Sequence, residues 1–573
     1  MNALRLGSPY PYEVIGMLTK SENKRFPKGR FVEYDIEVDA AGQQKTVAVE
    51  GRAPGLNSSN VVFGRIINET DDGQVYERVL VLGDPTRDLG SLAEGECRRV
   101  MAALDMAEAE HLPMEWVPVS SGAAIDMNTG TENLDWTARV LRRLIEYTQA
   151  GGEVNIIVAG INVGAQAYWN AEATMLMHCK GTLIMTDTGA MVLTGKRALD
   201  FSGSVSAEDN IGIGGVERIM APNGQAQFRA RDIVEAYQLL FRHYKFTNIS
   251  SRRPYGTKLA TLDPFDRDVS VYPYTDKLNQ GFTTIGDILG TGNAERKKPF
   301  DMRQVMQAVR DQDADCLERW QSQRDAETAI VWETSVCGFP VALIGIESRT
   351  VKRIGEIPND GPDTWTGGTL YPQSSKKVAR AMNAYSNSMP VVVLANLSGF
   401  DGSPESLRRL QLEYGAEIGR AAVNFKGPLI FIVVSRYHGG AYVVFSKTLN
   451  PSMRAVALEA TYASVIGGAP AAAVVFPRQV LKNTFADPRL IEAQAKHKKH
   501  QLTKAQYDDL YQTVHLEHQA LVATEFEKIH TVERAQKVGS IDAIIAAGQL
   551  RAFVGSELEF GVKKYLAADK AKK

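Results

Sequence analysis

The sequence predicts an α/β fold in which one domain plan is used twice. Two observations carry this prediction. Short apolar runs rich in β-branched residues alternate with longer amphipathic stretches, and the same landmarks recur in the same order in the second half of the chain. The chain has 573 residues, 44% of them apolar, which is enough for two domains that each bury a core. A single small module and a wholly disordered chain are therefore excluded.

The repeated landmarks are prolines and glycines that punctuate the predicted strands. Pro113 and Gly122 match Pro390 and Gly399, and both pairs are 277 residues apart. Two further steps recur 276 and 279 residues apart: Gly164-Ala165 with Gly440-Ala441, and Gly189-Ala190 with Gly468-Ala469. Chance is the alternative, because the chain has 49 glycines. Four ordered matches favour a duplication.

The elements follow in the same order in each half. Strands are predicted at 79–83, 154–160, 391–396 and 429–434, and helices at 91–111 and 406–425. Such alternation indicates parallel strand pairs. Residues 262–303 lack a sustained apolar period, so we expect the crossing between the halves there. The predicted domains are 1–290 and 291–573, and the charged sequence from about residue 480 predicts an amphipathic helical hairpin packed on the second domain.

Composition excludes whole classes of function. Lys plus Arg is 65 against 67 for Asp plus Glu, so a nucleic-acid partner is not expected. Four isolated cysteines suit a reducing compartment and predict a cytoplasmic protein. The N-terminal residues lack the apolar core of a signal peptide. The uncharged stretch 460–477 contains Gly-Gly and two prolines, so we expect a buried helix, a turn and a strand there, and no membrane span.

Motifs of other enzyme classes are missing or weak. The sequence has no GxSxG elbow and no Walker A loop, and the glycines of 210–219 lack the spacing of a dinucleotide fingerprint. His497 with His500, and His515 with His518, have the i, i+3 spacing of metal ligands but lie in a lysine-rich helical pattern. No metal is therefore predicted, and no pair of carboxylates stands out for acid-base chemistry.

The Gly-Ala steps themselves predict a chemistry. A strand that ends in Gly-Ala and continues into a helix leaves backbone N–H groups without acceptors at the positive end of the helix dipole. Two such steps can direct two N–H donors at one developing oxyanion. Close packing between strand and helix is the structural alternative for any one step. Recurrence at matched spacing in both halves favours an oxyanion site in each.

Longer segments resemble a known family. The stretch 214–224 (GGVERIMAPNG), the boxes DPFDR at 263–267 and PFDMR at 299–303, ESRTV at 347–351, and RYHGGAYVVFSKTLNP at 436–451 are similar to motifs of the carboxyltransferase component of biotin-dependent acyl-CoA carboxylases. The two boxes are further apart than in the eukaryotic-type acetyl-CoA carboxylase, which suggests an insertion between Arg267 and Pro299. The resemblance implies tandem crotonase-type domains, each a ββα superhelix.

The resemblance also implies roles for individual residues. The first half would receive the acyl-CoA thioester at Gly164-Ala165 and Gly122-Ala123, and the second half would receive biotin at Gly440-Ala441 and Gly399-Phe400. Arg349 matches an arginine near the product carboxylate, with an ion pair to Glu347 or Asp363 as its alternative, and Lys377 would contact CoA phosphates. Ala159 stands where the eukaryotic-type family has a second arginine. Val443 matches the acetyl-type pattern, which favours acetyl-CoA or a longer acyl chain.

The activity implied is transfer of CO2 from carboxybiotin, carried on a separate protein, to the α-carbon of an acyl-CoA, giving products of the malonyl-CoA type used in fatty acid biosynthesis. The partners implied are a biotin carboxyl carrier, a biotin carboxylase and a second copy of the chain, with active sites between subunits. Two alternatives stay open. One is a biotin-dependent acyl-CoA decarboxylase, and the other is a non-catalytic scaffold of a carboxylase complex.

Overall fold

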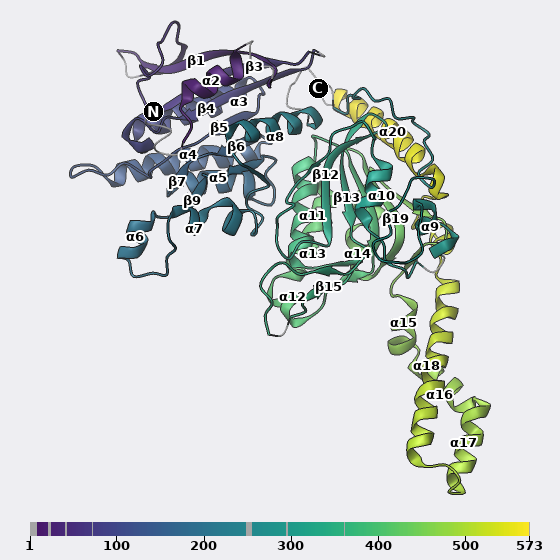
Figure 1. The fold of residues 1–573 in the computed structure, drawn as a ribbon. Helices are drawn as coiled ribbons and strands as arrows, with labels where there is room; N and C mark the ends of the chain where they lie inside the picture. The colour runs from purple at the N-terminus through teal and green to yellow at the C-terminus, as the bar shows by residue number, and fades with distance from the viewer. Residues whose placement is uncertain are drawn as a thin grey trace.

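The computed structural model divides the chain into two α/β units and an arm that projects from the second unit (Figure 1). It describes residues 8–20, 25–40, 43–71, 73–247, 255–293, 296–359 and 361–571. Each unit has one large sheet with helices on both faces.

The first sheet has the strand order β10-β8-β6-β5-β4-β3-β1-β2. Its antiparallel strands are β1 (Lys28–Val38), β2 (Gln44–Ala48), β3 (Val61–Glu69) and β4 (Val75–Gly83). Beyond β4 the strands are parallel: β5 (Met114–Val117), β6 (Val154–Val158), β8 (Leu183–Thr186) and β10 (Phe228–Ala230). A separate parallel pair joins β7 (Ile161–Val163) to β9 (Ala190–Val192).

Helices cover both faces of this sheet. The apolar side chains of α3 (Glu94–Ala109), α4 (Thr131–Gln149) and α5 (Ala165–Met175) pack on one face, and those of α2 (Pro11–Thr19) and α8 (Ile233–Phe246) pack on the other. Shorter helical segments follow β9: α6 (Lys196–Phe201), α7 (Asn210–Gly214) and a π-helical turn at Val216–Met220.

The second sheet has the strand order β11-β12-β13-β17-β19-β20-β22. Read from β1 to β10, the first sheet has the same succession of strands. The strands of the second sheet are β11 (Leu317–Glu318), β12 (Ala329–Val336), β13 (Phe339–Ile346), β17 (Val391–Leu397), β19 (Leu429–His438), β20 (Met453–Leu458) and β22 (Ala543–Ile545). The strands are antiparallel up to β13 and parallel beyond it, as in the first sheet. Short pairs join β14 (Val351–Lys352) to β15 (Thr364–Trp365), and β16 (Thr369–Leu370) to β18 (Gly399–Phe400).

The helices of the second unit also fall on two faces. One face carries α11 (Pro372–Tyr385), α13 (Gln411–Asn424) and α14 (Gly439–Val444), and the other carries α9 (Ile285–Leu289), α10 (Met302–Val309) and α20 (Leu550–Lys570). The helix expected at 406–425 is divided, because Leu410 has φ of 66° and separates α12 (Pro404–Arg408) from α13.

Matching sheet topology and helix placement confirm the predicted duplication. β5 and β17 each begin one residue after the paired prolines, and Gly122 and Gly399 both have positive φ. The match of Gly189-Ala190 with Gly468-Ala469 is wrong. Ala190 opens β9, whose counterpart β21 (Tyr462–Ser464) opens at Tyr462, whereas Gly468 begins the short helix α15 (Gly468–Pro470). Within 460–477, therefore, the strand precedes the helical turns, the reverse of the expected order.

The crossing segment belongs to the core of the second unit. Its buried apolar side chains, among them Val269, Phe282 and Ile285, pack with the second sheet and α20. The packing thus joins residues from Tyr255 onward to the second unit, earlier than the predicted boundary at 290.

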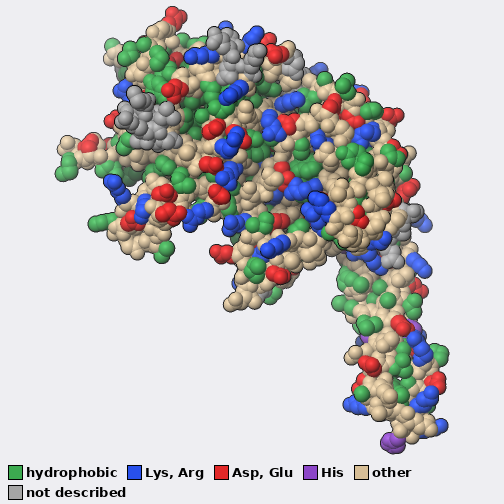
Figure 2. Space-filling view, in the orientation of Figure 1, with side chains coloured by type: hydrophobic (Ala, Val, Ile, Leu, Met, Phe, Trp, Pro, Cys, Tyr) green, Lys and Arg blue, Asp and Glu red, His purple; other side chains and the backbone are tan. Residues whose placement is uncertain are grey.

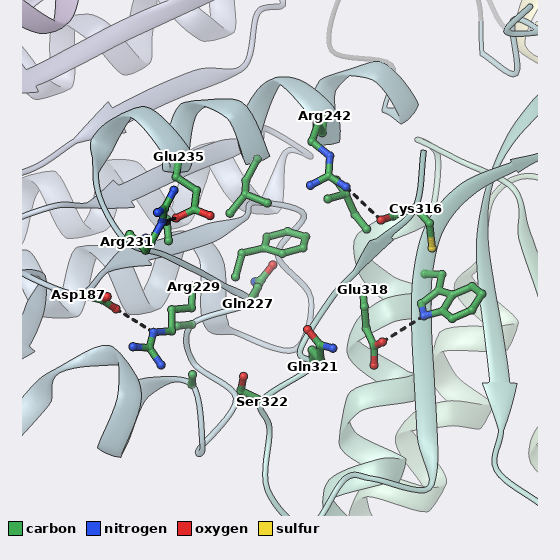
Figure 3. Close-up of a pocket in the computed structure, with 17 residues that line it drawn as sticks. Asp187, Gln227, Arg229, Arg231, Glu235, Arg242, Cys316, Glu318, Gln321 and Ser322 are labelled. Carbon is green, nitrogen blue, oxygen red and sulfur yellow. Dashed lines mark hydrogen bonds and ion pairs between the residues drawn. The ribbon is translucent and has the colours of Figure 1, made fainter. Parts of the chain in front are cut away.

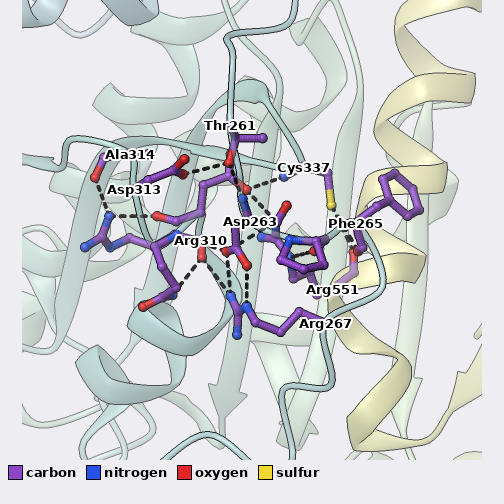
Figure 4. Close-up of polar contacts among 12 residues, drawn as sticks. Thr261, Asp263, Phe265, Arg267, Arg310, Asp313, Ala314, Cys337 and Arg551 are labelled. Carbon is purple, nitrogen blue, oxygen red and sulfur yellow. Dashed lines mark hydrogen bonds and ion pairs between the residues drawn. The ribbon is translucent and has the colours of Figure 1, made fainter.

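The DPFDR box fixes this segment (Figure 4). Asp263 accepts from the Arg267 guanidinium at 2.6 Å, and its other carboxylate oxygen lies 3.4 Å from Arg551 of α20. Arg551 also pairs with buried Asp311 at 2.6 Å and donates to the carbonyl oxygens of Pro264 and Val309. The box therefore acts in folding, because it binds the crossing segment to the last helix of the unit.

The residues expected to form a packed hairpin instead form a projecting arm. α16 (Pro477–Ala486), α17 (Pro488–Lys498) and α18 (Lys504–Ile529) extend away from both sheets, and the chain returns through α19 (Val532–Lys537). Apolar side chains, including those of Phe485 and Leu516, are exposed along the arm (Figure 2). The hairpin is thus confirmed as helical, but its packing on the second domain is wrong.

A buried carboxylate joins the two units. Glu333 on β12 is fully buried and accepts from Tyr385 Oη at 2.7 Å, while its second oxygen lies 2.7 Å from Nδ1 of His243 on α8. Arg319 lies 3.6 Å from the same carboxylate and donates to Gln227 of the first unit at 2.6 Å. These partners outweigh the effect of burial and hold the pKa of Glu333 below its ordinary value.

We expect Glu333→Gln to lower the free energy of unfolding by about 3–5 kcal/mol, because removing one side of a buried ion pair leaves its partners uncompensated. Glu413→Gln, at an exposed position of α13, is the matched control and should change stability by less than about 0.5 kcal/mol. Urea unfolding followed by circular dichroism measures both. Equal stability of the two variants would contradict a joining role for Glu333.

The same carboxylate predicts a pH dependence. Because its pKa is lower in the folded state, its stabilising contribution is complete above the unfolded value of about 4.5 and is lost as pH falls through the folded value. The unfolding midpoint of the wild type should therefore fall more steeply than that of Glu333→Gln below about pH 4.5. Parallel midpoint curves for the two proteins would exclude this contribution.

Candidate active site

The two Gly-Ala steps of the first half lie side by side. Gly164 precedes α5 with φ of 62° and ψ of −123°, and Gly122 has φ of 106°. A Cβ atom placed on Gly164 would lie 3.9 Å from the Cα of Gly122, and one placed on Gly122 would meet no atom within 4 Å. The structure thus brings both predicted steps together beside open space.

Hydrogen bonds identify which N–H groups are available there. The Gly164 N–H donates to the carbonyl oxygen of Val192 at 2.9 Å, and the Gly122 N–H donates to Ser120 Oγ at 2.9 Å. The N–H groups of Ala165 and Ala123 have no acceptor in the described part of the chain. The N–H groups available in the first half are therefore those of the two alanines, whereas the Gly164 N–H, predicted as a donor to the substrate, is already occupied.

A chain of buried amides supports this turn. Asn162 on β7 donates to the carbonyl oxygen of Pro118, Asn170 on α5 donates to Asn162, and Gln166 donates to Asn170, at 3.1, 3.0 and 2.9 Å. These hydrogen bonds hold β7, the strand before Gly164, against α5, the helix after it. Sequence reasoning missed these side chains, although Gln166 and Asn170 are four residues apart on α5, a spacing that places them on one face of the helix.

The second half brings its predicted residues together in the same way. A Cβ atom placed on Gly440 would lie 3.3 Å from Phe400 Cδ2, and Gly399 precedes Phe400 with open space where a side chain would stand. The Gly440 N–H has no acceptor in the described part of the chain. Ala441, predicted as a second donor, is fully buried and packs its methyl group in the core.

The register of the second step differs by one residue from the predicted one. Gly439 has φ of 63°, close to that of Gly164, and it follows the strand residue that pairs with Ser464 just as Gly164 follows the one that pairs with Val192. Gly439 is thus the counterpart of Gly164, and Gly440 is the counterpart of Ala165. Either glycine of a Gly-Gly pair can adopt positive φ, so the sequence could not distinguish them.

A separate cavity of about 570 Å³ lies between the two units (Figure 3), and none of the residues of either glycine turn lines it. Its arginines are already neutralised, since Arg229 pairs with Asp187, Arg231 with Glu235, and Arg242 with Asp315. Cys316 also lines it, and burial raises the pKa of that thiol to about 12. The cavity therefore offers no unpaired arginine or reactive thiolate.

Comparison with known proteins decides the family. The model of the carboxyl transferase domain matches residues 23–573. The chain belongs to the carboxyl transferase family.

Solved and curated relatives agree with this assignment. The transcarboxylase 12S hexamer, solved with methylmalonyl-coenzyme A, matches at a TM-score of 0.67 and 18% identity over 98% of this chain and 91% of that one, which shows the shared crotonase-type fold. Mitochondrial acetyl-CoA carboxylase of Saccharomyces cerevisiae is 28% identical over 42% of this chain, and acetyl-CoA carboxylase of Dictyostelium discoideum is 27% identical over 63%. The matches cover only 10% and 15% of those longer proteins.

The remaining predicted residues of this carboxyl transferase domain have different surroundings. Arg349 donates to Glu347 at 3.0 Å and lies 3.5 Å from Asp301, so the ion-pair alternative is present, with Asp301 in place of Asp363. Lys377 is 3% exposed and donates to the carbonyl oxygen of Trp320 at 3.1 Å. Burial lowers the Lys377 pKa to about 8. Its predicted contact with CoA phosphates is therefore wrong.

Two further positions bear on substrate binding. Val443 is 63% exposed on α14, close in sequence to Gly440. Ala159 is buried directly after β6, and its methyl group offers no charge at the position where the resemblance implies an arginine. Among the described residues, no group of three His, Cys, Asp or Glu side chains has the geometry of a metal site, and no helix is long and apolar enough to cross a bilayer.

The register of the second turn can be tested by stability. Gly439→Ala should lower the free energy of unfolding by about 1–2 kcal/mol, because alanine is strained at φ of 63° while its methyl group has space. Gly467→Ala is the matched control, since Gly467 has φ of −70° and equal space, and it should change stability by less than about 0.5 kcal/mol. A neutral Gly439→Ala in urea unfolding would contradict the assignment.

Proposed function

We propose that the chain is a biotin-dependent acyl-CoA carboxyltransferase, which moves CO2 from carboxylated biotin on a carrier to the α-carbon of an acyl-CoA. The observation that carries the proposal is the presence, in each half, of a glycine turn that presents backbone N–H groups without acceptors to open space. Such donors stabilise an oxyanion without any ionisable side chain.

In the first half, the N–H groups of Ala165 and Ala123 would bind the thioester oxygen of the acyl-CoA. Removing the α-proton places negative charge on this oxygen, and fixed donors in a site shielded from water stabilise that charge by about 3–4 kcal/mol each. Gly122 has no side chain, so the thioester can approach the donors closely.

In the second half, the residues fit the ureido ring of biotin. The Gly440 N–H would donate to the ureido oxygen, and Phe400 and the open face of Gly399 leave room for a flat ring. Carboxylated biotin supplies the CO2, and its ureido nitrogen supplies the base. The chain itself needs only to hold the two partners in register.

Val443 supports a substrate with an acetyl or longer acyl chain, because its exposed isopropyl group gives the site an apolar edge. The product would then be of the malonyl-CoA type, used in fatty acid biosynthesis, in the cytoplasm. The transcarboxylase relative was solved with methylmalonyl-coenzyme A, so a branched product is the competing outcome.

Assembly is part of the proposal. Val443 on α14 and Tyr168 on α5 are exposed beside the two turns, and the arm exposes further apolar side chains. A second copy of the chain would cover them, so that the acyl-CoA half of one subunit faces the biotin half of the other. The biotin carrier and biotin carboxylase would be further partners, supplied by other chains or domains.

Ala165→Pro tests the donor of the first half. Proline fits the first position of a helix but has no N–H, so α5 should keep its structure while kcat/KM for the acyl-CoA falls by about 10²–10³-fold. Lys504→Pro, at the first position of α18, is the matched control and should leave kcat/KM unchanged. Full activity of a folded Ala165→Pro would refute this oxyanion assignment.

A panel of acyl-CoAs from acetyl to long-chain, incubated with carrier, biotin carboxylase, ATP and labelled bicarbonate, tests the reaction. We expect label in a straight-chain acyl-CoA. Labelling of propionyl-CoA alone would overturn the substrate range. Loss of CO2 from a diacid-CoA without net labelling would identify a decarboxylase, and no reaction in either direction would identify a scaffold.

A further inference from the structure

A histidine stands directly before the glycine turn of the biotin half. His438 is the last residue of β19, and Gly439 and Gly440 follow it. Its side chain is 6% exposed, although histidine is a polar residue. Its counterpart in the first half is Val163, since the two residues occupy matching places before Gly439 and Gly164. An imidazole is therefore a feature of the biotin half alone.

The hydrogen bonds of this ring determine its tautomer. His438 Nδ1 lies 3.3 Å from the carbonyl oxygen of Ser464 and 3.0 Å from Ser464 Oγ. The Ser464 hydroxyl donates its own proton to the carbonyl oxygen of Ile466 at 2.6 Å. Both neighbours of Nδ1 are therefore acceptors, so Nδ1 carries the proton and Nε2 carries a lone pair.

Burial keeps the ring neutral. It lowers the pKa of His438 to about 4, with a smaller lowering from the Arg436 charge and an opposing effect of the hydrogen bond to Ser464. At neutral pH the ring has one acceptor nitrogen, Nε2, and this atom has no hydrogen-bond partner in the described part of the chain. His438 keeps 6% of its surface exposed and Nε2 is not among the fully buried unpartnered atoms, so this acceptor is open to a ligand that supplies a donor.

The ureido ring of biotin supplies such a donor. Its carbonyl oxygen accepts hydrogen bonds, one ring nitrogen carries the carboxyl group, and the other nitrogen keeps its N–H throughout the reaction. A site that orients the ring therefore needs a donor for the oxygen and an acceptor for the unreacted N–H. The Gly440 N–H can provide the donor, and Gly440 follows His438 by two residues in the sequence.

We propose that His438 Nε2 accepts the hydrogen bond of the unreacted ureido N–H and so orients biotin in the second half. This inference rests on the proposed carboxyltransferase function. The Ser464 contacts occupy Nδ1 and leave Nε2 as the acceptor of the imidazole. A hydrogen bond from one ureido N–H to this atom would distinguish the two nitrogens of the biotin ring. His438 is thus a residue that selects biotin and its orientation, without taking a proton in the reaction.

Two substitutions separate the acceptor from the bulk of the ring. His438→Phe keeps a planar ring but has no acceptor, and His438→Gln places an amide oxygen near the position of Nε2. With free biotin as the probe, ligand-observed NMR should show a Kd about 3- to 10-fold higher for His438→Phe than for the wild type, because a neutral hydrogen bond is lost. His438→Gln should restore most of the affinity.

Kinetics give a second readout. With the acyl-CoA on which the wild type is active, His438→Phe should raise KM for biotin or the carrier by the same 3- to 10-fold factor and leave KM for the acyl-CoA unchanged. Thermal unfolding by circular dichroism confirms that both variants are folded. If His438→Phe does not fold, the comparison of His438→Gln with His438→Leu decides.

The outcomes separate the two proposals. If the wild type is active and His438→Phe binds biotin with the same Kd, the role of His438 is overturned and the carboxyltransferase function stands. Equal increases in KM for biotin and in KM for the acyl-CoA also overturn this role, since they indicate general damage to the site. A wild type that neither binds biotin nor carboxylates any acyl-CoA overturns the carboxyltransferase function itself.

Discussion

A buried carboxylate stands at the centre of the contact between the two units. Glu333 lies on a strand of the second sheet, and its partner His243 comes from a helix of the first unit. A charge without solvent is tolerated only while its partners stay in place. The units therefore cannot slide past each other at low cost. The distance between the glycine turns of the two units of one chain is therefore fixed, and any assembly of copies inherits this spacing.

The site itself is made of backbone. In both halves a strand ends at a glycine with positive φ, the next residue presents its N–H, and a second glycine segment lies alongside. Side chains contribute mainly by holding these turns, as the amides of Asn162 and Asn170 do in the first half. This explains why no pair of carboxylates or nucleophile stands out in the sequence. In the proposed reaction the base is a nitrogen of biotin, so the chain does not have to supply a titrating group.

Much of the fold follows from patterns that local physics makes visible. Alternating strands and helices, with prolines and glycines at matched offsets, predicted the duplicated α/β plan and placed Gly122 and Gly164 in one site. What the sequence could not predict depends on contacts across long separations. Lys377 is buried where it donates to the carbonyl oxygen of Trp320, 57 residues away in the sequence, and the divided helix follows from one left-handed residue, Leu410. The N–H of Gly164 is occupied only because β7 pairs with β9.

The contact between Arg551 and the crossing segment has a consequence for the order of folding. The first unit takes all its strands from residues up to Ala230, so its core can close while the rest of the chain is still being synthesised. The second unit needs α20 to cover one face of its sheet and to pair with Asp311. The crossing segment, residues 262–303, is synthesised before all the strands of this sheet, but its partner Arg551 is synthesised after them. Until α20 has been made, that segment lacks the Arg551 contacts and the helix that completes the cover over its apolar side chains.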